Sequence, residues 1–553
     1  MRRSLARPIV WIGLAACSVA GFAISSAQDE KPEALSGPVW GRAGRKPTAS
    51  NEVFATADGC AQCHAAAPGA RALTTQLGDD ASPHGLWAAT PMANSFRDPY
   101  FHAQLARECE TNPADTAQIE SLCFRCHAPM ASHFARLKGK PLPPKAELAK
   151  DPLAHDGVSC TVCHQAQPSN FGDPASFSGN LVIEPGRTIF GPYAEPGGQP
   201  MLMHTAYTPT HGAHISDSAL CGSCHTLVTH TGINGSPFFE QAVYPEWLNS
   251  DFGRSGTKDD SCVGCHMANM GRMKIARNPA GSDFNIAVRD DVRGHAMVGG
   301  NAYLLELYRD FATDLGVTAS PESLDRLIRA TRAQLAHSTA TLTIENERFD
   351  GADLVFDIRV ENLTGHKFPA GYPSRRAWLN IQVQQSRKPV FESGGFDPAT
   401  GRLKGFAQEL GLPHRDVVDG ADDVVIYEMT AADLNGQTTT SLLAMASRAK
   451  DTRLLPKGWR ADGPYAEQTK PIGIDGDADF QAGGDVVHVR APNVDRQAGT
   501  PLIIVRLYYQ TIPPAWADGL RTSKTPEAAT FLGMYDAKPP VPETVALTAK
   551  SVQ

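Results

Sequence analysis

One five-residue pattern, Cys-X-X-Cys-His, occurs five times in the first half of the chain. The copies comprise Cys60, Cys63 and His64; Cys123, Cys126 and His127; Cys160, Cys163 and His164; Cys221, Cys224 and His225; and Cys262, Cys265 and His266. Two thiols three residues apart on a helical turn can bond the two vinyl groups of one porphyrin, and the adjacent His can ligate its iron. The sequence therefore predicts five covalently attached c-type haems, with the His of each copy as the proximal iron ligand.

Structural zinc is the alternative interpretation of the Cys pairs. A tetrahedral zinc site normally takes two such pairs per ion, so five pairs leave one unmatched. Zinc also gives no reason for a His directly after every pair. We therefore favour haem.

The sixth ligand of each iron decides what that haem can do, and His is the commonest candidate. Thirteen His lie outside the motifs, more than five sites can use, so for any single one a structural or surface role is the alternative. Sequence context singles out His211 and His214, just before the fourth motif, and His295 and His366, which follow Gly in loops that permit close approach. We expect His366 to reach back and ligate or cover an iron. His337 and His488 are expected to be structural.

The elements that must hold these groups divide the chain into two main regions. Residues 28–300 contain the motifs and many Pro and Gly, which predicts a helix-and-loop pentahaem domain with porphyrins replacing much of the core. Alternating long and short motif spacings suggest pairing of haem two with three and of four with five. Residues 301–338 predict a helical connector, with Ser320-Pro321 beginning its second helix.

From 339 to 553 the pattern changes to apolar residues at every second position. Such runs occur at 354–360, 379–383, 424–429, 485–490 and 502–509. This period predicts strands, and turn residues between them predict a β-sandwich-like domain. The fold class is therefore α+β.

The first 27 residues have the pattern of an export signal. Arg2, Arg3 and Arg7 precede a mostly apolar run that ends in small residues before Gln28. Export to the periplasm or beyond agrees with haem attachment, which happens outside the cytoplasm. The alternative is a lipoprotein signal that leaves Cys17 as an acylated N-terminus, although the apolar run continues beyond Cys17.

Charge and hydropathy limit the partners. The formal net charge is −8, and removal of the Arg-containing signal makes the chain more acidic. This acidity argues against nucleic acid and leaves redox proteins with basic docking surfaces as partners. No segment after the signal reaches 18 uninterrupted apolar residues, so we expect no membrane span.

Several phrases around the motifs resemble a known family. They include LWAATPMANSFRDPYFHA, CFRCHAPMA, DGVSCTVCH, YPEWL, GHAMVGGN and NLTGHKFPAGYPSRRAWL, and together they cover much of residues 85–380. These phrases are similar to those of multihaem cytochromes related to the tetrahaem cytochrome that accepts electrons from hydroxylamine oxidoreductase. The resemblance implies closely spaced haems, mostly with two His ligands each, an electron-transfer role and an added C-terminal β domain.

Two departures from that family affect the ligands. The chain has five motifs rather than four, and it has Met92 where many relatives have His. A thioether ligand would raise the potential of that haem, whereas the alternative is a Met that packs on the porphyrin, with His84 as the ligand instead.

The sequence favours an electron carrier over an enzyme. It contains no nucleophile elbow, phosphate loop or zinc-hydrolase motif, and no cluster of Lys, Tyr or Arg beside one haem motif. The alternative is a multihaem oxidoreductase that acts on a small nitrogen or sulfur compound at one open haem.

Overall fold

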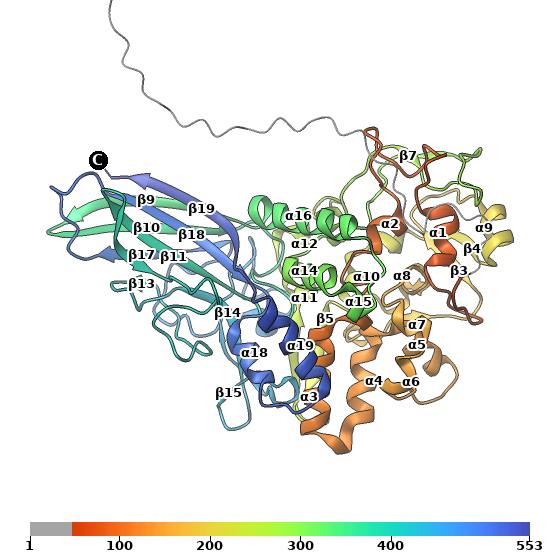
Figure 1. Cartoon of the computed structure of the whole chain (residues 1–553), viewed down its shortest axis with the longest axis horizontal. Coiled ribbons are helices and arrows are strands. Elements are labelled where there is room, and N and C mark those ends of the chain that lie inside the picture. The colour runs from red at the N-terminus through yellow and green to blue at the C-terminus, as the bar shows by residue number, and fades with distance from the viewer. Residues whose placement is uncertain (1–46, 553) are drawn as a thin grey trace, which may run out of the picture.

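The computed structural model describes residues 47–552, so the export signal and Cys17 lie outside the described residues. Helices and loops fill one side of the molecule and long strands the other, as Figure 1 shows. The chain is therefore α+β, as the sequence predicts. Within residues 47–552, no helix combines the length and apolar character needed to cross a membrane.

Each haem motif lies on or begins in a short helix. These helices are α1 (Asp58–His64), α4 (Thr116–His127), α8 (Cys160–Cys163), α10 (Ser218–Gly222) and α13 (Cys262–His266). The side chains of Asp217 and Ser261 accept hydrogen bonds from backbone amides at the starts of α10 and α13, which fixes where these turns begin. The helical turn that haem attachment requires is thus formed locally at each motif.

Short elements connect the motif helices. The helices are α2 (Pro83–Trp87), α3 (Pro99–Thr111), α5 (Pro129–Leu137), α6 (Lys145–Leu148), α7 (Pro152–His155), α9 (Gly198–Thr205), α11 (Val243–Leu248) and α12 (Asp251–Ser255). The paired strands are β1 (Ala166–Gln167) with β2 (Val182–Ile183), β3 (Thr188–Gly191) with β4 (Thr208–His211), β5 (Thr226–His230) with β6 (Pro237–Ala242), and β7 (Met273–Lys274) with β8 (Val288–Arg289). Four of these helices, α2, α3, α5 and α7, begin with Pro at their first position, which the chain's Pro content supports.

The connector consists of α14 (Ala302–Asp310), α15 (Ala312–Leu315) and α16 (Pro321–Ser338). Ser320 caps α16 by accepting a hydrogen bond from the Ser323 amide, which confirms the predicted start. Leu324, Leu327 and Ile328 of α16 pack with Leu304 of α14 in one buried cluster. The two predicted amphipathic helices therefore bury their apolar faces against each other.

Two larger sheets form the second region. The larger has the order β15-β14-β11-β18-β19, with β12 also paired to β11 and β16 to β14, and the smaller has the order β13-β17-β10-β9. The strands are β9 (Ala340–Asp350), β10 (Asp353–Asn362), β11 (Arg376–Gln385), β12 (Lys388–Ser393), β13 (Val417–Val418), β14 (Ile426–Ala432), β15 (Thr438–Thr439), β16 (Ser447–Asp451), β17 (Gly484–Ala491), β18 (Leu502–Gln510) and β19 (Glu543–Ser551). All five predicted strand runs overlap strands, although the run at 424–429 begins two residues before β14.

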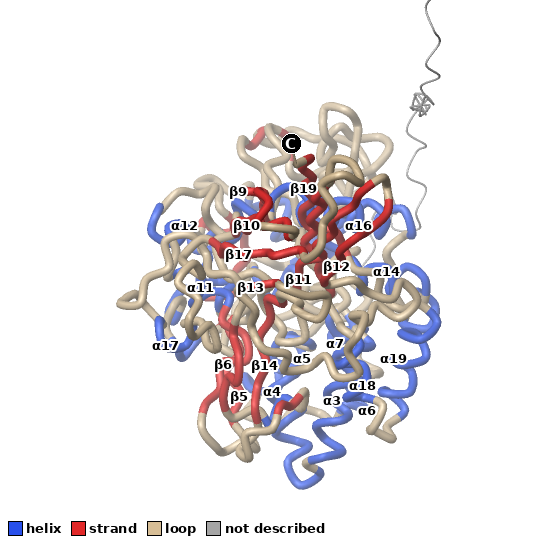
Figure 2. The backbone as a smooth tube through the Cα atoms, turned by 90° about the vertical axis from the view of Figure 1, so that its left-hand side faces the viewer, coloured by secondary structure: helices blue, strands red, loops and turns tan. Residues whose placement is uncertain are grey.

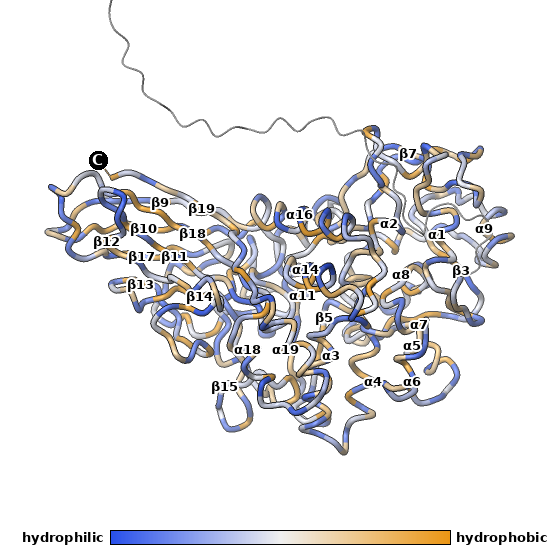
Figure 3. Tube along the Cα trace, in the orientation of Figure 1, coloured by the Kyte–Doolittle hydropathy of each residue, from blue (hydrophilic) through white to orange (hydrophobic). Residues whose placement is uncertain are grey.

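One hydrophobic core joins these sheets. Phe356 and Ile358 of β10 belong to the same buried cluster as Ile381 of β11 and Val505 of β18. The register places Ile381 opposite Val505, and alternate residues on each strand therefore face the shared core. Apolar colouring concentrates along these strands in Figure 3.

Two helices near the C-terminus return to the haem-motif region. α18 (Pro514–Leu520) and α19 (Pro526–Ala537) lie beside α3 in both Figure 1 and Figure 2, and Phe531 packs against Tyr100 of α3. The sequence pattern after residue 339 predicts strands and not these helices. Pro at the first helical position and the Thr525 side-chain cap favour helix α19 instead. Helices α18 and α19 thus pack the second region against the first.

Candidate haem-binding site

All fifteen Cys and His of the five motifs line one continuous cavity. Its volume is about 2010 Å³, and its wall includes residues from both regions of the chain, among them His295, His366 and Tyr509. Motifs spread over two hundred residues of sequence are therefore brought to a single internal space.

The attachment thiols of different motifs lie beside one another. Cys60 lies close to Cys160, Cys126 to Cys224, and Cys221 to Cys262, and each pair of thiols affects the other's pKa. Motif one thus adjoins motif three, while motif four adjoins both motif two and motif five. The suggested neighbourhood of four and five agrees with this arrangement. The thiols also place motif two beside motif four, and the suggested pairing of haem two with haem three stays a prediction.

Four motif His direct one ring nitrogen to a backbone carbonyl. The Nδ1 atoms donate to Ile275 (His64, 2.9 Å), Ser95 (His127, 3.0 Å), Phe190 (His164, 2.7 Å) and Val298 (His266, 2.5 Å). A carbonyl oxygen can only accept, so Nδ1 carries the proton and Nε2 keeps its lone pair. This is the tautomer that a metal-bound imidazole needs, and the hydrogen bond fixes the ring orientation.

Two candidate distal His stand opposite motif His with nearly parallel rings. The ring centres of His164 and His295 are 6.2 Å apart with planes at 16°, and those of His266 and His366 are 6.3 Å apart with planes at 9°. Two metal–nitrogen bonds of about 2 Å, plus roughly 1.1 Å from each nitrogen to its ring centre, require about 6 Å between ring centres. Each pair therefore suits two ligands of one iron.

The rings of His295 and His366 have the same tautomer as the four motif rings. His295 donates Nδ1–H to Arg293 O at 3.1 Å and His366 to Lys367 O at 2.9 Å. Burial lowers the pKa of each ring to about 4, so both are neutral at pH 7 with Nε2 able to bind a metal.

Glycine brings these two His close to the cavity wall. A side-chain carbon at Gly365 would lie 3.1 Å from both Trp247 and Phe252, and one at Gly294 would lie 2.9 Å from the Met270 sulfur. The Gly-His pairs that singled out His295 and His366 in the sequence therefore correspond to close approach of two segments.

The other four candidate ligands have different surroundings. His84 is half-buried and lines the cavity, and desolvation lowers its pKa to about 4; Met92 also lines the cavity. His211 is exposed at the end of β4 and is absent from the lining. His214 directs Nε2 to Ala166 O at 3.0 Å and is also absent from the lining. The geometry therefore favours His84 and Met92 over His211 and His214.

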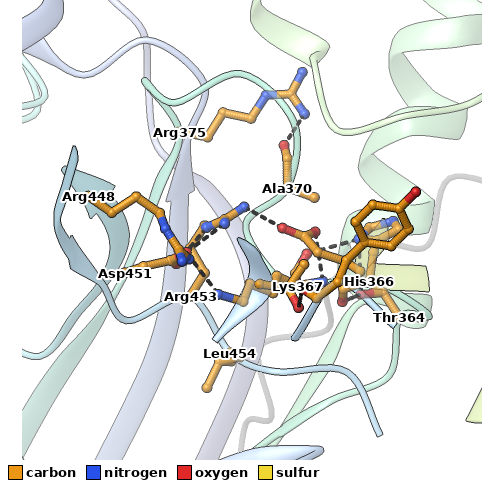
Figure 4. A network of polar contacts seen from close by, with 12 residues as sticks. Thr364, His366, Lys367, Ala370, Arg375, Arg448, Asp451, Arg453 and Leu454 are labelled. Carbon is orange, nitrogen blue, oxygen red and sulfur yellow. Dashed lines mark hydrogen bonds and ion pairs between the residues drawn. The ribbon is translucent and has the colours of Figure 1, made fainter. Parts of the chain in front are cut away.

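A buried ionic network anchors the loop that carries His366. Figure 4 shows Asp451 between Lys367, Arg448 and Arg453. Asp451 accepts from Lys367 Nζ at 2.8 Å, from Arg448 Nη1 at 3.0 Å and from Arg453 Nε at 2.8 Å, and both Asp451 and Lys367 are completely buried.

Glu246 of α11 extends this network into the haem-motif region. It lies 2.9 Å from Arg453 Nη1 and accepts the backbone amide of Lys367 at 3.2 Å. The phrase YPEWL, noticed in the sequence only as part of the family resemblance, thus supplies a carboxylate that positions the residue after His366. The two regions are joined directly beside the His266–His366 pair.

Four polar side chains on the cavity wall were not found from the sequence: Tyr100, Gln104, Glu240 and Tyr372. Within the described residues, the two carboxylate oxygens of Glu240 have no well-aligned hydrogen-bond partner. The same holds for the Tyr372 hydroxyl. Burial raises the pKa of Glu240 to about 8, with the Gln241 side chain opposing, and its charge acts on Cys123 and Cys126 of the second motif. Strand alternation could have found Glu240, because Phe238, Glu240 and Ala242 share the buried face of β6.

The donor set fits haem c. Paired thiols on helical turns would form the thioether bonds, oriented neutral imidazoles would ligate the iron, and the large shared cavity would hold the porphyrins. When bound, such haems supply reversible one-electron oxidation and reduction.

Comparison with known proteins agrees with the motifs. A family model described as cytochrome c554 and c-prime matches residues 59–165, which include the first three motifs. Among solved structures, a penta-haem cytochrome c552 from Thermochromatium tepidum aligns over 91% of this chain and 100% of its own, with 15% identity and a TM-score of 0.49. No curated protein matches.

Proposed function

We propose that this multihaem c-type cytochrome is an exported carrier that moves electrons between redox proteins through five covalent haems. The observation that supports it best is the closeness of attachment thiols from different sites, which links site one to site three and site four to both two and five. The charge of Cys163 raises the pKa of both Cys221 and Cys224, so motif three also lies near motif four. Haems attached at these positions would form a continuous, branched path.

The pattern of the chain supports the remaining parts of the proposal. The N-terminal sequence supports export to the periplasm, with cleavage before Gln28 or, as the alternative, lipidation of Cys17. The shared core of the two larger sheets supports a β-sandwich-like second domain that contributes His366. The acidic net charge supports partners with basic docking surfaces.

Intact-mass analysis of protein produced with the haem-attachment machinery is expected to give the mass of residues 28–553 plus five haems. The reason is that all five motifs are intact and follow an export signal. Replacing Cys262 and Cys265 together by Ser should remove the mass of one haem. A wild-type mass with fewer haems would contradict the haem count, and a diacylglyceryl start at Cys17 would contradict cleavage before Gln28.

A second function is favoured by the polar wall beside the second motif. Glu240, Tyr372 and Gln104 line the cavity, and within the described residues each has a buried polar atom without a hydrogen-bond partner, which gives this wall the polar character that a pocket for a small polar substrate needs. This observation supports the alternative of an oxidoreductase that acts on a small nitrogen or sulfur compound.

The two functions differ in an assay. As a carrier, the reduced protein should pass electrons to a small oxidised cytochrome at a rate that falls with rising salt, while nitrite, hydroxylamine and sulfite are turned over negligibly. Turnover of any of these compounds on the order of tens per second would favour the oxidoreductase over the carrier. In that case Glu240→Gln should lower turnover, whereas Glu467→Gln, at an exposed site, should not.

A further inference from the structure

Three side chains from separate segments of the second region converge away from the haem-motif cavity. His414 precedes β13, Asp477 lies in the loop before β17, and Asp485 is the second residue of β17. One ring nitrogen of His414 and one carboxylate oxygen from each Asp all lie within 4.8 Å of one another. They adjoin a cavity of about 290 Å³ whose wall includes His414, Asp416 and Asp477.

The cluster has more acceptors than donors. Asp485 is 2% exposed, and its Oδ1 has no hydrogen-bond partner among the described residues. The same holds for His414 Nδ1, on a side chain that is 5% exposed, and for Asp416 Oδ1. Burying such atoms without a partner is costly, so the arrangement calls for a ligand that accepts lone pairs.

No Lys or Arg in the described chain forms an ion pair with these three Asp. His414 Nε2 lies 2.6 Å from Asp477 Oδ2, the Tyr427 hydroxyl donates to Asp485 Oδ2 at 2.8 Å, and the nearby Arg415 pairs with Asp423 instead. Burial, together with the charges of Asp477 and Asp416 and against the Tyr427 hydrogen bond, raises the pKa of Asp485 to about 7. These carboxylates therefore lack a compensating cation.

We propose that His414, Asp477 and Asp485, with Asp416 at the cavity side, bind one divalent transition-metal ion such as zinc. One imidazole with two or three carboxylates is a donor set that zinc accepts, and the imidazole disfavours calcium and magnesium. The ion would join the loop before β13 and the loop before β17 to the start of β17. Tyr427 is a positioning residue, because its hydroxyl orients the Asp485 carboxylate.

The competing interpretation is a metal-free cluster in which His414 and Asp477 form a hydrogen-bonded pair and Asp485 carries a proton. Both interpretations keep the same contacts in the folded protein. They differ in whether zinc binds stoichiometrically and whether that binding depends on Asp485.

The test uses the five-haem protein, dialysed against EDTA and then equilibrated with zinc chloride. Elemental analysis should give about one zinc per chain, and zinc should raise the thermal unfolding temperature because it binds only the folded state. Asp485→Asn keeps the size and the Tyr427 contact and should abolish stoichiometric binding. Tyr427→Phe should weaken it by about 10–100-fold. His337→Ala, at an exposed His, is the matched control and should bind as wild type does.

Three results would overturn the proposal. They are wild-type protein that takes up no zinc, Asp485→Asn protein that still binds one zinc per chain, and stabilisation by calcium but not by zinc. The wild-type measurements decide even if a variant fails to fold.

Discussion

Replacing His366 by Ala is expected to leave one haem in five without its sixth ligand. That haem should change from low-spin to high-spin in electron paramagnetic resonance and in magnetic circular dichroism. The reason is that His366 faces His266 at 6.3 Å with nearly parallel rings, the arrangement of two ligands of one iron. Added imidazole should restore the low-spin signal.

Two variants separate ligation from disturbance of the fold. His366→Met replaces one possible ligand by another and should raise the potential of that single haem. His337→Ala removes an exposed His at the end of α16 and should leave all five haems unchanged. Five low-spin haems in His366→Ala would show that His366 is not a ligand.

Replacing Asp451 by Ala is expected to lower the free energy of unfolding by about 3–5 kcal/mol, because three cations are left without their shared buried anion. Lys367, Arg448 and Arg453 all donate to this carboxylate. Denaturant titration followed by far-UV circular dichroism measures the loss. Since Lys367 follows His366, the spectrum of the same single haem should also change.

An exposed ion pair provides the matched control. Asp462 lies 3.7 Å from Arg460 with an 88% exposed side chain, so Asp462→Ala should cost less than about 1 kcal/mol. Equal losses for Asp451→Ala and Asp462→Ala would contradict the role given to the buried network.

The contribution of Asp451 should also depend on pH. Burial alone would raise its pKa, but Arg453, Lys367 and Arg448 overcome burial and hold the pKa far below its usual range. A carboxyl with a depressed folded-state pKa stabilises the fold above the unfolded pKa of about 4 and loses this contribution as pH falls below it. The stability difference between wild type and Asp451→Ala should therefore narrow only below about pH 4.

The sequence predicted what depends on local pattern. Attachment motifs need only a helical turn, so Cys262–His266 could be identified without knowledge of the fold. Alternation likewise identified β10 and β18, because each strand buries every second residue against one core. His366 could be singled out because a Gly before a His in a Pro-rich loop indicates close approach of backbone.

What the sequence missed depends on contacts between distant segments. The adjacency of motifs two and four requires Cys126 and Cys224 to meet, and spacing along the chain does not encode that contact. Glu246 and Asp451 are separated by a large part of the sequence, and neither has a local pattern that announces the partner. Helices α18 and α19 come after a region with strand periodicity. Their position beside α3 depends on packing between segments far apart in the sequence.

The pairing of His266 with His366 also sets an order of events during biosynthesis. On export from the N-terminus, the fifth motif would leave the cytoplasm before the loop of His366 and the later Asp451 and Arg453 that anchor that loop. A haem attached at Cys262 and Cys265 would therefore wait, with one face uncovered, until the strands of the second region have assembled. That haem would gain its second His ligand only when the whole chain has folded. Its change to a low-spin spectrum would therefore report the completion of folding.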